Sequence, residues 1–339
     1  MTRSVRFASV AGLWLLGLAL ACGGGRTFAA PERWSDVTTW GGTLPRPGAD
    51  VYIGRGRTVL LDVDPPPLAR LVIDGRLLVA RRDLRLRAGG ISVQGSLEAG
   101  SASLPFEHRL RIVLDGASAA AGTLSIANGG RLELFGAKRT AWLRLAATAE
   151  PGARELSLEI APQWHAGDRI AIAPSGYDAR EAEERGIVSV EGTRVVLDRP
   201  LRYRHWGTLA SGIDERAEVG LLTHAVSVES ESHAAARGLG GQVLVLRGGM
   251  LEASGVTFEG LGQRGRLGRY PIHFHLAGDA RDSFVEASSI VHSQNRCVAI
   301  HGSSGVVIRD DVAFDTIGHC YFLEDGVESG NTFGQHLRR

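Results

Sequence analysis

The segment RYPIHFHLAGD, Arg269 to Asp279, carries two imidazoles on alternate residues of an apolar strand. His273 and His275 are separated and followed by apolar side chains, namely Ile272, Phe274 and Leu276. Because successive side chains of a strand point to opposite faces, both histidines share one face and the apolar groups share the other. Neutral imidazoles serve as general bases or as metal ligands. The segment therefore predicts a chemical site on a β-strand.

Two later segments align with this strand. CVAIH ends at His301 and CYFLE ends at Glu324, and the starts of PIHFH, CVAIH and CYFLE are 26 and 23 residues apart. If the three segments stack as parallel strands ~4.8 Å apart, His275, His301 and Glu324 form a column on one face. The same register puts Cys297 over Cys320, within reach of a disulfide. Two buried free thiols are the alternative.

The column predicts acid–base chemistry. Glu324 is the candidate general acid, and His275 and His301 are candidate bases or metal ligands. Asp325 or Asp279 is the candidate second carboxyl group, and these two acids also suit a hard cation such as Ca²⁺. The alternative is a polar ladder on a strand surface with no chemistry.

Polar residues near these strands are candidates for substrate binding, since Arg recognises carboxylates in a bidentate manner. The set is Arg216, Arg264, Arg266, Arg269, His273, Asn295, Arg296 and His319. For Arg216 the alternative is a structural ion pair, and for Arg264 to Arg269 it is a solvated loop.

The rest of the chain reads as short strands. The whole chain has 339 residues, of which 45 are glycine. Its net charge of +1 excludes binding of nucleic acid through bulk charge. Short runs of Val, Ile and Leu recur every twenty-odd residues with Gly and Asn between them, which is typical of a parallel β-helix. A β-sandwich is the competing all-β fold.

The N-terminus predicts export. Arg3 and Arg6 precede an apolar run from Val10 to Ala21, which is typical of a signal peptide over residues 1–22. LALAC, ending at Cys22, fits a lipoprotein cleavage box, and ordinary cleavage is the alternative. We expect an extracytoplasmic protein, secreted or held at the cell surface by a lipid on Cys22, with no other membrane contact.

Several long motifs resemble one protein family. WSDVTTWGGTLPRPGADVYIGRGRTVLLD resembles the start of a G8 domain. PQWHAGDRIAIAPSGYD, IDERAEVGLL, YPIHFHLAGD and CVAIHGSSGVVIRDDVAFDTIGHCYFLEDG resemble the core of the cell migration-inducing hyaluronan-binding protein and transmembrane hyaluronidase family. The resemblance implies a glycine-rich G8 β domain over 31–147 and a right-handed parallel β-helix over 148–339, which we expect to be truncated at its C-terminus.

The resemblance also implies a function. Family members bind hyaluronan and depolymerise it by endo-hydrolysis, and some depend on calcium. We therefore expect a hyaluronidase-like glycoside hydrolase whose partner is an acidic polysaccharide. A polysaccharide lyase and a non-catalytic glycan-binding or adhesion module are the alternatives that the residues leave open.

Overall fold

The computed structural model describes residues 30–115, 122–209 and 212–334. The predicted signal peptide and Cys22 lie outside these residues. Residues 31–339 group as one compact unit. Across the described ranges, none of the helices has the length and apolar character needed to cross a bilayer.

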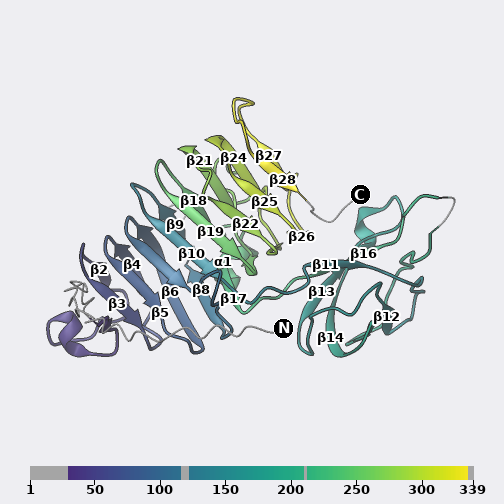
Figure 1. The fold of residues 1–339 in the computed structure, drawn as a ribbon, viewed down its shortest axis with the longest axis horizontal. Helices are drawn as coiled ribbons and strands as arrows, with labels where there is room; N and C mark the ends of the chain where they lie inside the picture. The colour runs from purple at the N-terminus through teal and green to yellow at the C-terminus, as the bar shows by residue number, and fades with distance from the viewer. Residues whose placement is uncertain (1–29, 116–121, 210–211, 335–339) are drawn as a thin grey trace, which may run out of the picture. The chain divides into compact units, whose positions relative to one another are not determined.

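Parallel strands stacked coil upon coil form the first long sheet (Figure 1). Its strands, in spatial order, are β1 (Glu32–Arg33), β3 (Thr58–Leu61), β5 (Arg76–Val79), β7 (Ser96–Ala99), β10 (Arg131–Phe135), β19 (Met250–Ser254), β22 (Phe284–Glu286), β25 (Val307–Arg309) and β28 (Thr332–Gly334). The colour in Figure 1 runs along this stack from purple at β3 to yellow at β28.

A second parallel sheet divides at a long strand, β6 (Leu84–Val93). The first half of β6 continues through β8 (Leu110–Leu114), β17 (Val226–Ser230), β20 (Val256–Glu259), β23 (Ser289–Val291) and β26 (Val312–Phe314). The second half continues through β9 (Thr123–Ile126), β18 (Gln242–Val245), β21 (Ile272–Asp279), β24 (Val298–Ser304) and β27 (Tyr321–Leu323). Before β6, the sheet contains β2 (Asp50–Ile53) and β4 (Leu68–Ile73).

The inward face of each coil is apolar and fully buried. Ile73, Val93, Ile126 and Val245 are all 0% exposed and belong to one continuous core. No single coil buries this face by itself, so the stacking of neighbouring coils supplies the hydrophobic stabilisation. The predicted parallel β-helix is confirmed.

Glycine lies where successive coils turn closely over one another. A Cβ atom at Gly95 would overlap the carbonyl oxygen of Gly75, and a Cβ at Gly75 would overlap that of Gly54. This close backbone approach leaves no room for a side chain at either position.

An antiparallel sheet interrupts the coil between β10 and β17. Its spatial order is β11 (Trp142–Arg144), β16 (Glu218–Leu221), β13 (Arg169–Ile172), β14 (Glu183–Glu191), β15 (Arg194–Leu197) and β12 (Glu155–Ser157). It has its own buried core, which includes Trp164, Ile170 and Val219. Helical segments are short: η1 (Val37–Trp40), η2 (Ala179–Glu181) and α1 (Ser232–Ala236).

The observed architecture differs from the division predicted at residue 147. Parallel coils begin at β1, and β10 pairs with β7 on one side and with β19 on the other, so the coil continues across the insertion. The β-helix therefore includes most of residues 31–147, whereas residues 142–221 form the antiparallel sheet and are not part of the parallel coil. Short alternating strands look alike in parallel and antiparallel pairing, which is why the sequence pattern did not separate them.

One buried acid yields a stability prediction. Asp311 is 1% exposed, its Oδ1 accepts a hydrogen bond from the Ser288 amide at 2.9 Å, and burial raises its pKa well above 3.8. The folded state therefore binds this proton more tightly than the unfolded state, and the stabilisation is lost as pH rises above 3.8. Asp311→Asn should raise the free energy of unfolding at pH 7.5 by about 1–3 kcal/mol and have little effect near pH 4.

Urea denaturation at both pH values measures this difference. Asp282→Asn, at an exposed position nearby, is the control and should leave stability unchanged at both. Identical pH dependence for the wild type and Asp311→Asn would contradict the assignment.

Candidate functional site

The register predicted from the three segments is confirmed. Strand β21 pairs with β24 so that Ile272 lies beside Val298 and His275 beside His301. Strand β24 pairs with β27, and the Glu324 amide donates to the Ile300 carbonyl at 3.0 Å, which continues the same register one residue further. Ile272, Phe274, Val298 and Ile300 are fully buried in the coil, and the histidines lie on its outer face. Backbone pairing thus brings His275, His301 and Glu324 together.

Alternation fails after His275. The sequence predicts Leu276 on the apolar face, but its side chain is 47% exposed. Its φ of 51° and the register shift between His275 and Gly278 bend the strand at this point. The apolar face also ends at β27, where Leu323 is 41% exposed because β27 is the last described strand of this stack.

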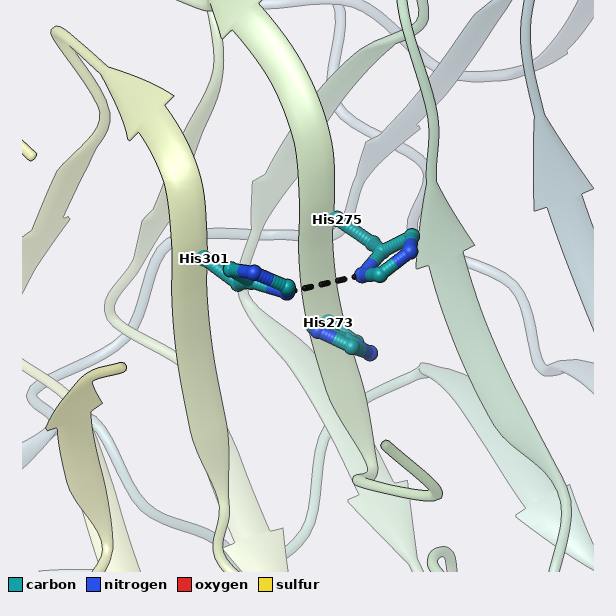
Figure 2. Close-up of side chains that lie close together, drawn as sticks. All are labelled: His273, His275 and His301. Carbon is teal, nitrogen blue, oxygen red and sulfur yellow. Dashed lines mark hydrogen bonds between the residues drawn. The ribbon is translucent and has the colours of Figure 1, made fainter. Parts of the chain in front are cut away.

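His273, His275 and His301 converge, and we call them, with Glu324, the histidine cluster (Figure 2). One nitrogen from each imidazole lies within 4.8 Å of the other two. The Nδ1 atoms of His275 and His301 are 2.9 Å apart, and the rings of His273 and His301 are nearly parallel with centroids 6.1 Å apart. Among the described residues, the three histidines are the one group of three or more His, Cys, Asp or Glu side chains close enough to share a metal ion.

His273 is the buried member of the histidine cluster. Its side chain is 3% exposed, and its Nδ1 is 3.1 Å from the Gly268 carbonyl oxygen. An Nδ1–H donor is the tautomer that satisfies this contact, because a carbonyl oxygen only accepts. Burial lowers the pKa of His273 to about 4, so the ring is neutral and its Nε2 carries a lone pair.

His301 is oriented in the same manner. Its Nε2 lies 2.9 Å from Oδ2 of Asp325, a contact that an Nε2–H makes with a carboxylate. The Nδ1 lone pair then points toward His275 and Glu324. Burial, with His301 as the next contribution, lowers the pKa of His275.

Glu324 completes the cluster. Its Oε1 accepts a hydrogen bond from the Tyr270 hydroxyl at 3.1 Å. Its Oε2 is buried without a hydrogen-bond partner, 3.8 Å from His273 Nε2 and 3.9 Å from His301 Nδ1. The free oxygen of Glu324 therefore faces the histidines and not the solvent.

A loop with three predicted arginines covers one side of the cluster. Residues 263–270, which we call the arginine loop, contain Arg264, Arg266 and Arg269. The side-chain amide of Asn295 donates to three carbonyls of this loop, those of Gln263, Arg266 and Arg269. Asn295, predicted to bind substrate, therefore also holds the loop that covers His273.

Arg296 and His319 lie next to the cluster, as predicted. The Arg296 Nε donates to His319 Nε2 at 2.9 Å and its Nη1 donates to the Tyr270 hydroxyl at 3.0 Å. The guanidinium stacks 4.4 Å from the centroid of the Phe322 ring. No carboxylate of the described residues forms an ion pair with Arg296 or with the arginines of the loop, whose side-chain bonds go to Gln294 and Thr123.

Two predicted residues make their contacts elsewhere. Arg216 lies in the turn before β16 and pairs with Asp214 and Glu159, and its hydrogen bonds lower the pKa of Asp214 to about 2. Asp279 pairs with Arg281 at the far end of β21. Among the described contacts, none joins either residue to the histidine cluster. The calcium site predicted at Asp279 and Asp325 stays a prediction.

Tyr270 and Phe322 were not predicted as site residues. Tyr270 is 0% exposed and touches both Glu324 and Arg296. The sequence signal that could have identified Tyr270 is its position directly before PIHFH. A buried tyrosine has a hydroxyl group that requires a hydrogen-bond partner. Phe322 pairs directly with Ala299, which pairs with His273, so Phe322 lies on the face of the histidines.

The two cysteines of the described residues form a disulfide at the start of β24 and β27. Cys297 and Cys320 are linked with their Cα atoms 4.4 Å apart. The sequence leaves two alternatives open, a disulfide or two buried free thiols, and the structure shows the disulfide.

The disulfide links two residues that are 23 positions apart in the sequence, at the starts of the strands that lead to His301 and Glu324. Loop-closure entropy predicts that replacing both cysteines by alanine lowers the free energy of unfolding by about 3 kcal/mol. Urea denaturation of the oxidised wild type and the double variant measures the difference. Reduction of the wild type should reproduce it, and equal stability of all three forms would contradict the prediction.

Comparison with known families agrees with this architecture. The G8 domain family model matches residues 39–146, and the CEMIP beta-helix model matches residues 238–338. A G8 domain-containing protein of Dictyostelium discoideum is 32% identical over 88% of this chain and 28% of its own length. Human fibrocystin-L is 32% identical over 91% of this chain and 9% of its own length. The predicted resemblance to G8 and CEMIP-type proteins is confirmed, and the chain spans less than a third of these two relatives.

Solved structures share less with this chain. A tailspike of Acinetobacter baumannii bacteriophage AP22, solved with a capsular saccharide, is 12% identical over 69% of this chain and 47% of its own, with a TM-score of 0.27. A tailspike of Pseudomonas phage phi297 is 13% identical over 75% and 40%, with a TM-score of 0.25.

Proposed function

We propose that this protein binds an acidic, hyaluronan-like polysaccharide outside the cytoplasm and cleaves it by endo-hydrolysis. The observation that carries the proposal is a set of four arginines beside the histidine cluster that lack carboxylate partners among the described residues: Arg264, Arg266, Arg269 and Arg296. Many arginines elsewhere on the coil, such as Arg111 and Arg309, are paired with acids. Guanidinium groups without counter-ions suit the carboxylates of a uronate polymer.

Aromatic side chains support a sugar as the ligand. Arg296 is held over Phe322 and against Tyr270, and the His319 ring lies 4.8 Å from that of Phe322. A fixed cation next to aromatic faces can pair with a uronate while sugar rings stack beside it. The family resemblance, which implies hyaluronan binding, points to the same ligand class.

The sequence predicts Glu324 as the general acid; for the cleavage step we assign this role to Asp325 instead, with its carboxyl group protonated before the reaction. Its side chain is 45% exposed and contacts His301, whereas the free oxygen of Glu324 is buried among the histidines. In hydrolysis the acid protonates the glycosidic oxygen as its bond to the anomeric carbon breaks, and water supplies the new hydroxyl. The attacking water gives its proton to the Asp325 carboxylate, which is thereby restored to its acid form.

Binding is tested with Arg296→Gln. Loss of one charge-assisted contact should weaken retention of hyaluronan oligosaccharides about 10-fold, and the remaining affinity should fall as salt is raised. Calorimetry at low ionic strength measures the dissociation constant. Arg281→Gln is the matched control, because Arg281 is already paired with Asp279. Equal losses in both variants would contradict a specific role for Arg296.

Cleavage is tested on the purified chain with hyaluronan, chondroitin, alginate and pectate. Chain length is followed by size exclusion and unsaturated ends by ultraviolet absorbance. We expect shortening without new absorbance, reduced at least ~100-fold in Asp325→Asn and unchanged in Glu191→Gln, an exposed acid of the antiparallel sheet. New absorbance would identify a lyase instead, and retention without shortening would identify a binding module.

A further inference from the structure

We propose that the histidine cluster is a transition-metal site of the zinc class, with the imidazoles of His273, His275 and His301 and the carboxylate of Glu324 as its four ligands. The inference stands on the geometry of these side chains and does not rest on the proposed function, although both concern the same region.

The first argument is the orientation of the donor atoms. His273 turns its outer nitrogen to the Gly268 carbonyl, and His301 turns its outer nitrogen to the Asp325 carboxylate. The inner nitrogen of each ring then carries a lone pair. His273 Nε2 has no hydrogen-bond partner, whereas His301 Nδ1 accepts the hydrogen bond that Nδ1–H of His275 donates, and a metal ion would replace this bond. A metal-bound histidine characteristically donates its other N–H to a backbone carbonyl or a carboxylate, and both forms occur here.

The second argument is a pair of buried atoms without hydrogen bonds. His273 Nε2 and Glu324 Oε2 are both inaccessible and unpartnered. They face each other at 3.8 Å, which is too long for a hydrogen bond. An uncompensated buried polar atom is costly, so this pair indicates a missing partner that accepts lone pairs from both sides. A cation is such a partner, and so is a water molecule that donates one proton to each atom; the convergence of three imidazoles on the same point favours the cation.

The spacing of the donors fits a tetrahedral ion. Zinc–nitrogen and zinc–oxygen bonds of about 2.0–2.1 Å separate neighbouring ligand atoms by roughly 3.3–3.4 Å. The observed separations are 2.9 Å between His275 and His301, 3.8 Å between His273 and Glu324, and 3.9 Å between His301 and Glu324. Shifts of about half an ångström bring these three separations to the ideal value, and one nitrogen of His273 lies within 4.8 Å of the other two imidazoles, so it would have to move closer when the ion binds.

The donor types select the metal. Three imidazole nitrogens and one carboxylate oxygen suit Zn²⁺ and its neighbours in the first transition series, whereas Ca²⁺ takes six to eight oxygen ligands. The calcium dependence implied by the family resemblance therefore does not apply to this cluster. When bound, the ion would supply Lewis acidity and would hold β21, β24 and the end of β27 together.

The test measures zinc without any glycan. The full chain is stripped with a chelator and titrated with Zn²⁺ by calorimetry, and with Co²⁺ by visible absorption. We expect one ion per chain, an absorption spectrum of four-coordinate cobalt, and a higher melting temperature with zinc. His301→Ala should weaken zinc binding at least ~100-fold and Glu324→Gln about 10–100-fold.

His108→Ala is the matched control, since His108 is a partly exposed histidine before β8, in an earlier coil, and should bind zinc like the wild type. Circular dichroism of the stripped variants separates loss of ligand from loss of fold, and Glu324→Gln serves where a histidine variant does not fold. If the wild type binds no zinc, or if the wild type, His301→Ala and Glu324→Gln bind zinc with equal affinity, the proposed metal site is wrong.

Failure of this inference and failure of the proposed function are distinguishable. One zinc per chain without glycan shortening supports the metal site and overturns the hydrolase. Glycan shortening by a chain that binds no zinc supports the hydrolase and overturns the metal site.

Discussion

In-register parallel pairing between successive coils is the constraint on which the site depends. Backbone hydrogen bonds hold neighbouring strands ~4.8 Å apart, so residues at the same register position of two coils become neighbours whatever their separation in sequence. His275 and His301 are 26 residues apart and their imidazoles touch. The disulfide between Cys297 and Cys320 joins the starts of β24 and β27 in the same register. Because the coil core is rigid and fully apolar, the outer face presents these side chains without requiring any conformational change.

The polar atoms around the cluster show a consistent pattern. Those that point outward have partners: Gly268 for His273, Asp325 for His301 and Tyr270 for Glu324. Of those that point inward, the Nδ1 atoms of His275 and His301 share a hydrogen bond, whereas His273 Nε2 and Glu324 Oε2 lack partners. A structural polar ladder would pair all of its inner atoms, because burial without a hydrogen bond is unfavourable. The two unpartnered atoms are the ones that the proposed metal ion would bind.

Much of this could be predicted from the sequence because alternation and spacing are local properties. The apolar residues Ile272 and Phe274 fix which face of β21 is buried, and the recurrence of Cys-x-x-x-His and Cys-x-x-x-Glu fixes the register. Other features depend on long-range packing that no local pattern encodes. The burial of His273 results from the arginine loop held by Asn295, the bend at Leu276 results from a left-handed residue, and the antiparallel insertion uses strands of the same length and composition as the coil. The pairing of Arg216 with Asp214 is likewise visible only in three dimensions.

The register itself can be measured directly with paired cysteines. His275→Cys combined with His301→Cys puts two thiols at directly paired positions, within the Cα range of a disulfide. His273→Cys combined with His301→Cys puts them on the same face but two residues out of register, ~8 Å apart, beyond that range. After mild oxidation and digestion without reductant, mass spectrometry should find the first crosslink together with the native Cys297–Cys320 bond, and should not find the second. Crosslinking of the second pair in place of the first would contradict the register and the site that is built on it.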